Sequence, residues 1–299
     1  MDSLYLLMPL CSSLLFVFGV LCLKRAGSRG VGPWTVTFVT NMFTTAVILV
    51  LLGMTPQVPD WKLMWQPIMI AGLYIAGQVC TFSAIHHGDV SIATPLFSTK
   101  VLWVAGLATI VSGTRLGMPI WFAAVLAVAG VVLIQTSGGA SKHHRVLFSV
   151  TFALTAAFCF ASFDTLLQHA SVDWKVENIL PMVFIIAAVL SLGFIPFLEN
   201  RENLQGNWRT PLFGGAFLIA LQAMCLVYAI GKFGDTTRIN IVYTLRGLWG
   251  VVLPWFFGRW LSLGESKLAR DIMTRRLVGA ILVMTAVSVA ILYSGTERP

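Results

Sequence analysis

Long apolar runs alternate with short polar connections along the whole chain. A helix that crosses the hydrocarbon core of a bilayer needs about 20 apolar residues, at a rise of about 1.5 Å per residue. Ten runs qualify, at residues 4–23, 33–52, 64–84, 90–112, 118–136, 146–168, 178–198, 211–230, 237–260 and 274–294. The pattern predicts an all-α membrane protein with ten transmembrane helices and no separate soluble domain.

The first run is long for the apolar region of a cleaved secretory signal, which has about 7–15 residues. No Lys or Arg precedes Leu4, whereas Lys24 and Arg25 follow the run. These flanks are wrong for a signal peptide. We therefore expect residues 4–23 to be the first membrane helix.

Composition agrees with a lipid environment. Hydrophobic residues make up 57% of the 299 residues and charged residues 11%, whereas a soluble domain has about 25% charged residues. The net charge of +8 does not indicate nucleic-acid binding, because all Lys and Arg except Lys100 and Arg246 lie in loops or near predicted helix ends. Basic residues in short loops set membrane orientation. Their distribution places both termini outside the cytoplasm.

An internal repeat relates the two halves of the chain. When the chain is shifted by 146 positions, residues 88–103 lie over residues 234–249, with identical Gly, Asp, Leu and Trp and with Lys100 on Arg246. Five helices per unit is an odd number, so the second unit enters the membrane from the opposite face. Inverted repeats of this kind are common in transporters. We expect residues 1–140 and 141–299 to form two inverted five-helix repeats.

Several motifs carry a resemblance to a known family. They are Gly88-Asp89-Val90-Ser91-Ile92-Ala93, then Gly113-Thr114-Arg115-Leu116 before an Ala-Gly-rich run, and Leu263-Gly264-Glu265 in the second half. With the five-plus-five plan, they resemble the ten-helix EamA-type branch of the drug/metabolite transporter superfamily. The resemblance implies export or exchange of a metabolite, amino acid or drug-like compound. It also implies cytoplasmic termini, which disagrees with the charge count.

Lys100 and Arg246 are the strongest candidates for a solute site. Each lies about ten residues into its predicted helix, near the bilayer centre, where a cation costs at least about 2.5–3.5 kcal/mol. A cavity or a buried partner must therefore offset that cost. The simplest role is to hold a carboxylate or phosphate, with Arg246 as a bidentate fork and Lys100 as a point charge. The alternative is a structural cation satisfied by helix-end carbonyls.

Aromatic residues stand three positions before and after each cation, on the same helical face. They are Phe97 and Trp103 around Lys100, and Tyr243 and Trp249 around Arg246. Such rings could line the cavity and stabilise the cations through cation–π contacts. They could equally be packing or lipid-facing residues.

Other polar residues lie within the predicted spans. Asp164 could be a counter-ion to Lys100 or Arg246, a proton site for coupled transport, or a hydrated residue near a helix end. Asn240 is a further candidate for solute binding. Asn41, Gln78 and Gln222, like Asn240, are also of the type that forms hydrogen bonds between membrane helices.

Asp89 and Asp235 directly precede apolar helices, which is the N-cap position, so we expect capping there. The five cysteines are scattered and form no Cys-x-x-Cys pair, so no disulfide framework, metal site or cofactor is expected. The sequence contains no His-Glu-x-x-His motif, which would indicate a zinc protease.

The sequence therefore predicts a secondary transporter rather than an enzyme, with a channel or membrane sensor as the alternative. Its expected partners are a small-molecule solute and membrane lipids. We expect a monomer or a homodimer in a cell membrane, the bacterial inner membrane being the expected location.

Overall fold

The described part of the chain is entirely helical. The computed structural model describes residues 3–53, 61–86, 96–111, 116–135, 146–199, 204, 206–249 and 270–293. In the first half the helices are η1 (Ser3–Leu6), α1 (Leu7–Gly27), α2 (Pro33–Leu52), η2 (Trp61–Leu63), α3 (Trp65–His86), α5 (Lys100–Val111) and α6 (Met118–Gln135). In the second half they are α7 (Val146–Trp174), α8 (Val176–Ser191), η4 (Leu192–Phe197), α9 (Arg209–Phe233), α10 (Thr236–Tyr243) and α12 (Arg270–Leu292).

Six of the described helical segments are long and apolar enough to cross a membrane. They are Leu4–Gly27, Pro33–Leu52, Trp61–Ala84, Leu147–Trp174, Val176–Phe197 and Arg209–Phe233. Three shorter apolar helices, Lys100–Val111, Met118–Leu133 and Val278–Leu292, accompany them. Large apolar side chains such as Val50, Ile110 and Val172 are about four-fifths exposed. A surface of this kind is stable in lipid and unstable in water.

Most helix limits follow from local chemistry. Pro33 begins α2, where its fixed φ suits the first turn, and Gly53 ends the helix at φ 69°. α7 continues to Trp174, beyond the predicted end at residue 168. α12 begins at Arg270, four residues before the predicted start.

The fourth and ninth predicted segments are not continuous helices, contrary to the prediction. Residues 98–99 form a turn before α5, and Thr244 forms a turn after α10. Val101 N–H donates to the Ser98 carbonyl at 3.3 Å, and Gly247 N–H donates to the Thr244 carbonyl at 2.9 Å. These bonds join residues i and i+3, as in a 3₁₀-helix, which is wound more tightly than an α-helix with its bonds between residues i and i+4.

The hydroxyl groups near these turns explain why apolar composition does not keep the helices regular. Thr99 Oγ1 donates to the Leu96 carbonyl at 2.7 Å, and Thr244 Oγ1 donates to the Ile241 carbonyl at 2.5 Å. Ser and Thr side chains compete with helix geometry in this way. The first turn ends directly before Lys100, and the second lies two residues before Arg246.

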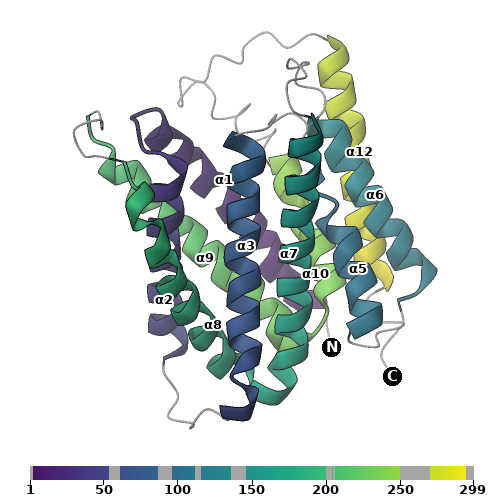
Figure 1. Cartoon of the computed structure of the whole chain (residues 1–299). Helices are drawn as coiled ribbons and strands as arrows, with labels where there is room; N and C mark the ends of the chain where they lie inside the picture. The colour runs from purple at the N-terminus through teal and green to yellow at the C-terminus, as the bar shows by residue number, and fades with distance from the viewer. Residues whose placement is uncertain are drawn as a thin grey trace.

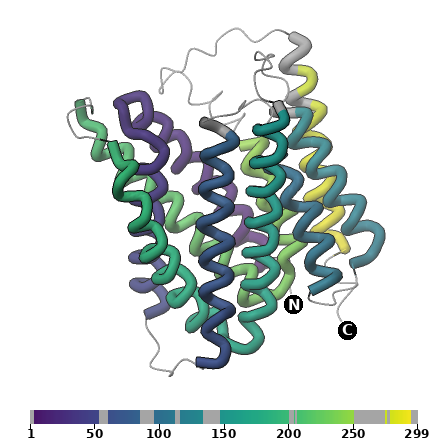
Figure 2. Tube along the Cα trace, viewed as in Figure 1, coloured from purple at the N-terminus to yellow at the C-terminus, as the bar shows by residue number. Residues whose placement is uncertain are grey.

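Helices from the first half of the chain pack mainly against helices from the second half. α1 packs on α9, α3 on α7, α6 on α12, and α2 on α8 and α9. Figure 1 shows α3 beside α7 in the middle of the bundle and α6 beside α12 at one side. The tube in Figure 2 shows the same alternation of early and late segments across the bundle.

The two longest of these pairs are antiparallel. The ring of Tyr5, just before α1, stacks on Phe233 at the end of α9, with centroids 5.0 Å apart. Trp174 Nε1, at the end of α7, donates to Gln66 Oε1, at the start of α3, at 2.8 Å. The first helices of the two halves, α1 and α7, therefore begin at opposite ends of the bundle.

Polar side chains inside the bundle tie helices together. Asn41 and Gln78 exchange two hydrogen bonds, of 3.0 and 2.9 Å, and Asn41 Nδ2 also donates to Ser191 Oγ at 2.8 Å. Gln222 Nε2 donates to Ser12 Oγ at 3.1 Å. The interhelical alternative for Asn41, Gln78 and Gln222 is thus what the structure contains.

Candidate functional site

A buried ion pair lies where α5 begins. Lys100 Nζ is 2.7 Å from Asp164 Oδ2 on α7, and the two side chains are 14% and 2% exposed. Asp164 does not lie at a hydrated helix end, because α7 continues ten residues past it to Trp174. A charge at this depth requires a partner, and each residue supplies the other's.

Asn240 on α10 completes this side of the site. Its Nδ2 donates to Asp164 Oδ2 at 2.8 Å and to the Thr236 carbonyl at 2.9 Å. One carboxylate oxygen therefore accepts from both the ammonium of Lys100 and the amide of Asn240. Within the described residues, the buried Asn240 Oδ1 has no hydrogen-bond partner.

Arg246 has a different environment from Lys100. Its guanidinium carbon lies 4.9 Å from the ring centroid of Phe16 on α1 and 4.6 Å from that of Tyr243. Its Nη1 donates to Tyr243 Oη at 3.3 Å. The described residues contain no carboxylate in an ion pair with Arg246. Aromatic faces therefore stabilise this cation without neutralising it.

The two cations belong to one electrostatic neighbourhood. Asn240, which donates to the partner of Lys100, and Tyr243, which contacts Arg246, lie three residues apart on α10. Phe16 and Tyr243 meet edge to face, with centroids 6.1 Å apart. We call Lys100, Asp164, Asn240, Arg246, Tyr243 and Phe16 the central cluster.

The structure brings together only some of the aromatic residues predicted around the cations. Tyr243 contacts Arg246, and Trp249 Nε1 donates to Ser13 Oγ on α1 at 3.1 Å. Trp103 is 41% exposed and meets Phe158 edge to face. Phe97 packs with a small cluster around Ala84 and Ala153.

The helix break explains the position of Phe97. A three-residue spacing places side chains on one face only within a continuous helix, and the turn at residues 98–99 separates Phe97 from α5. Phe16 and Ser13 were missed altogether. They lie more than 200 positions from Arg246 and Trp249 in the sequence, and no motif or repeat marks them.

A second polar cluster lies at the other end of α10. Asp235 accepts the backbone N–H of Arg238 and caps α10, which confirms the predicted capping; Asp89 lies outside the described residues. Asp235 Oδ2 also accepts from Arg238 Nη1 at 2.9 Å and from Tyr5 Oη at 2.5 Å. Arg238 Nη2 donates to the Tyr293 carbonyl at 3.0 Å. Arg238 is thus a buried, paired residue rather than a loop charge.

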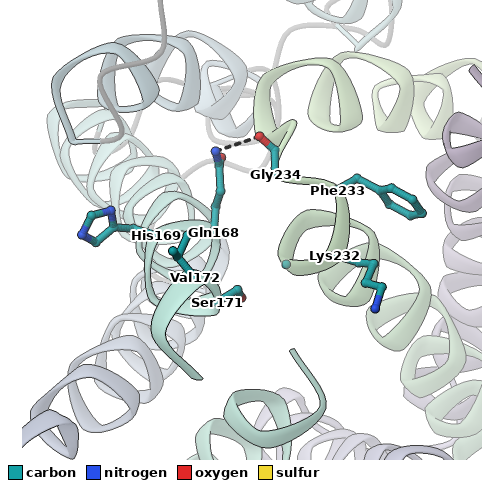
Figure 3. A pocket seen from close by; sticks show the side chains of 8 residues that line it. Gln168, His169, Ser171, Val172, Lys232, Phe233 and Gly234 are labelled. Atoms are coloured by element: carbon teal, nitrogen blue, oxygen red, sulfur yellow. Dashed lines mark hydrogen bonds between the residues drawn. The ribbon is translucent and has the colours of Figure 1, made fainter. Parts of the chain in front are cut away.

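A cavity of about 400 Å³ lies between the ends of α7 and α9. Figure 3 shows Gln168, Ser171 and Val172 on one side and Lys232 to Gly234 on the other. Gln168 Nε2 donates to the Gly234 carbonyl at 2.8 Å across the cavity. Lys232 forms an exposed ion pair of 3.3 Å with Glu177. The cation that lines this cavity, Lys232, is therefore already paired with a carboxylate of the protein.

Comparison with known proteins agrees with the fold. The EamA-like transporter family matches residues 3–136. An uncharacterized transporter of Archaeoglobus fulgidus is 22% identical over 254 residues, which cover 84% of this chain and 84% of that protein. One crystal structure superposes with a TM-score of 0.72 at 16% identity, covering 98% of this chain and 99% of that one.

The family consists of membrane transporters rather than enzymes, and the described helices are long and apolar as such a protein requires. The all-α membrane architecture is therefore confirmed, and so is the resemblance to this family over residues 3–136; the motif at residues 263–265 lies outside the described residues. The solute of a transporter is a small molecule, and the comparisons name none. The first part of the chain, residues 3–136, is therefore identified with the EamA-like transporter family, and the chain as a whole is similar to an uncharacterized transporter.

Proposed function

We propose that the protein is a secondary transporter that carries a small anionic metabolite by alternating access, with Arg246 as the anion-binding residue. The observation that carries the proposal is the environment of Arg246. Its guanidinium is partly buried, lies against two aromatic rings and has no carboxylate partner among the described residues. A cation so placed attracts the carboxylate or phosphate group of a solute.

The proposed architecture is two inverted five-helix repeats, residues 1–140 and 141–299. Two facts support it. The packing of α1 on α9 corresponds, when the halves are exchanged, to that of α7 on α3. The turns at Ser98 and Thr244 also stand 146 positions apart, at matching places in the repeat.

The proposed site lies at the interface of these repeats, as in other inverted-repeat transporters. Discontinuous helices supply it, since Lys100 opens α5 and Arg246 follows the turn after α10. Tyr243, Trp249 and Phe16 contribute the apolar wall. Lys100, Asp164 and Asn240 form the adjoining polar wall. Phe97 and Trp103, which pack elsewhere, have no part in this proposal.

The proposed location is a bacterial inner membrane, which the protein crosses several times. Rocking of the two repeats would expose the central cluster to either side in turn. Exchange of solutes and coupling to protons both agree with this arrangement, and Asp164 is the acidic residue within the cluster that a proton could occupy.

The test is counterflow in proteoliposomes with a panel of anionic, zwitterionic and cationic metabolites. We expect uptake of anions by the wild type and its loss in Arg246→Met. Trp103→Leu is the control. Trp103 lies three residues after Lys100, the residue equivalent to Arg246 in the other repeat, but it is exposed and packs on Phe158 outside the central cluster. Anion counterflow that survives in Arg246→Met would disprove the assignment, as would a wild type that moves only cations.

A further inference from the structure

We propose that the solute carried by this protein is a monoanion, and that the Lys100–Asp164 pair sets this limit. The inference rests on the proposed function, because it concerns the same anion site. The central cluster contains two positive groups and one negative group. With Asp164 ionised, its net charge is therefore +1, and the charge without a partner in the described residues is that of Arg246.

Lys100 is not available to a second anionic group. Its ammonium lies 2.7 Å from Asp164, whose side chain is 2% exposed. Asn240 holds the same carboxylate oxygen at 2.8 Å. Drawing Lys100 toward a solute would leave the carboxylate buried and unpaired, which is strongly unfavourable.

A solute with two negative charges would therefore bring one charge that nothing in the described cluster neutralises. An uncompensated charge in a site of low polarity is costly. The rings of Phe16 and Tyr243 stabilise a cation and repel an anion, because the face of an aromatic ring is electronegative. A single carboxylate or sulfonate on an apolar body fits both the charge and the aromatic wall.

The repeat explains how this asymmetry arises. Lys100 and Arg246 occupy equivalent positions, and the helix beside each one is the first of the opposite repeat, α7 or α1. α7 offers Asp164 to Lys100, whereas α1 offers Phe16 to Arg246. The cation of the first repeat, Lys100, is thus neutralised by Asp164 of the protein. The cation of the second repeat, Arg246, remains available to the solute.

Charge-altering variants test the inference with permanently charged probes. The probes form two matched pairs, methanesulfonate with methanedisulfonate and benzenesulfonate with meta-benzenedisulfonate. Each is measured by titration calorimetry on purified protein in detergent and by counterflow in proteoliposomes. Because sulfonates stay ionised, the probe charge does not change with pH.

Four proteins give a defined series of site charges. The wild type has +1, Asp164→Asn has +2, Lys100→Met has zero, and the double variant Lys100→Met with Asp164→Asn returns to +1. We expect the wild type and the double variant to prefer the monosulfonate. We expect Asp164→Asn to shift the ratio of affinities toward the disulfonate by about tenfold or more, and Lys100→Met to lose binding of both.

A purely structural role for the ion pair would not produce this series. It would weaken all probes together and would make the double variant at least as poor as the single ones. An unchanged ratio in Asp164→Asn, or a wild type that prefers the disulfonates, overturns the monoanion inference while the anion carrier stands. Failure of the wild type to bind any member of either pair overturns the anion site itself. Size-exclusion chromatography of each variant identifies those that do not fold.

Discussion

Gly130 allows α6 and α12 to approach more closely than any side chain would permit. A Cβ atom at this position would lie 2.7 Å from the carbonyl oxygen of Gly279, 2.7 Å from Val283 Cγ2 and 2.9 Å from the backbone nitrogen of Val283. A carbon normally stays about 3.3–3.6 Å from a carbonyl oxygen. Because two of the three atoms belong to the backbone, no rotamer change removes the clash, and the helices must separate by roughly 0.6–0.9 Å.

Gly130→Ala should therefore lower the free energy of unfolding. Overpacking costs about 1–3 kcal/mol, and the better helix propensity of Ala returns up to about 1 kcal/mol, which leaves a net loss of about 1 kcal/mol from the middle of the range. Gly72→Ala in α3 is the matched control, because among the described residues no atom outside its own helix turn lies within 4 Å of its added Cβ. That variant should be unchanged or more stable by about 0.5–1 kcal/mol.

Unfolding in mixed micelles of dodecyl maltoside and dodecyl sulfate, followed by far-ultraviolet circular dichroism, measures both variants. The decisive quantity is the difference between them, about 2 kcal/mol. Equal stability of the two variants would show that α6 and α12 do not pack through Gly130, and the close contact between these two helices would be wrong.

Three further stability predictions use the same titration. Asp235→Ala should lower the free energy of unfolding by about 3–5 kcal/mol, because it leaves the buried Arg238 without its carboxylate. Asn41→Leu should lower it by about 0.6–1.7 kcal/mol, because it breaks an interhelical network. Lys232→Gln should change it by less than about 1 kcal/mol, since the pair with Glu177 is exposed. A Lys232→Gln effect as large as that of Asp235→Ala would contradict the burial argument.

The positions of most helices could be predicted because hydropathy is a strong and local signal. The limits of α2 agree with the sequence at both ends, where Pro33 and Gly53 act through their own backbone preferences. The turns before Lys100 and Arg246 could not be predicted from hydropathy. The apolar character continues through both segments, and the turns depend on which carbonyl the hydroxyls of Thr99 and Thr244 find.

Part of the central cluster could also be predicted from hydropathy. A charge within an apolar run marks Lys100, Asp164 and Arg246 in the sequence without any knowledge of contacts. Which of the two cations Asp164 serves depends on the packing of α7 against α5, and the sequence left that choice open. Phe16 is an ordinary aromatic residue in an apolar helix, so only the fold shows that it faces Arg246.

Phe16 therefore offers the most direct test of the asymmetry between the two half-sites. Its ring centroid lies 4.9 Å from the guanidinium carbon of Arg246, and a Glu side chain in its place would reach the same group. Phe16→Glu would give Arg246 an internal counter-ion, as Asp164 does for Lys100, and the net charge of the cluster would fall from +1 to zero.

A neutral cluster no longer attracts a monoanion, so binding of benzenesulfonate to Phe16→Glu should fall by about tenfold or more. Phe16→Leu is the control, since it removes the ring without adding charge and should lose only the cation–π contribution, about two- to fivefold. Calorimetry on the purified variants gives both ratios. If Phe16→Glu bound the probe as well as Phe16→Leu, Arg246 would not be the residue that holds the anion, because a carboxylate in contact with it would have to compete with the solute.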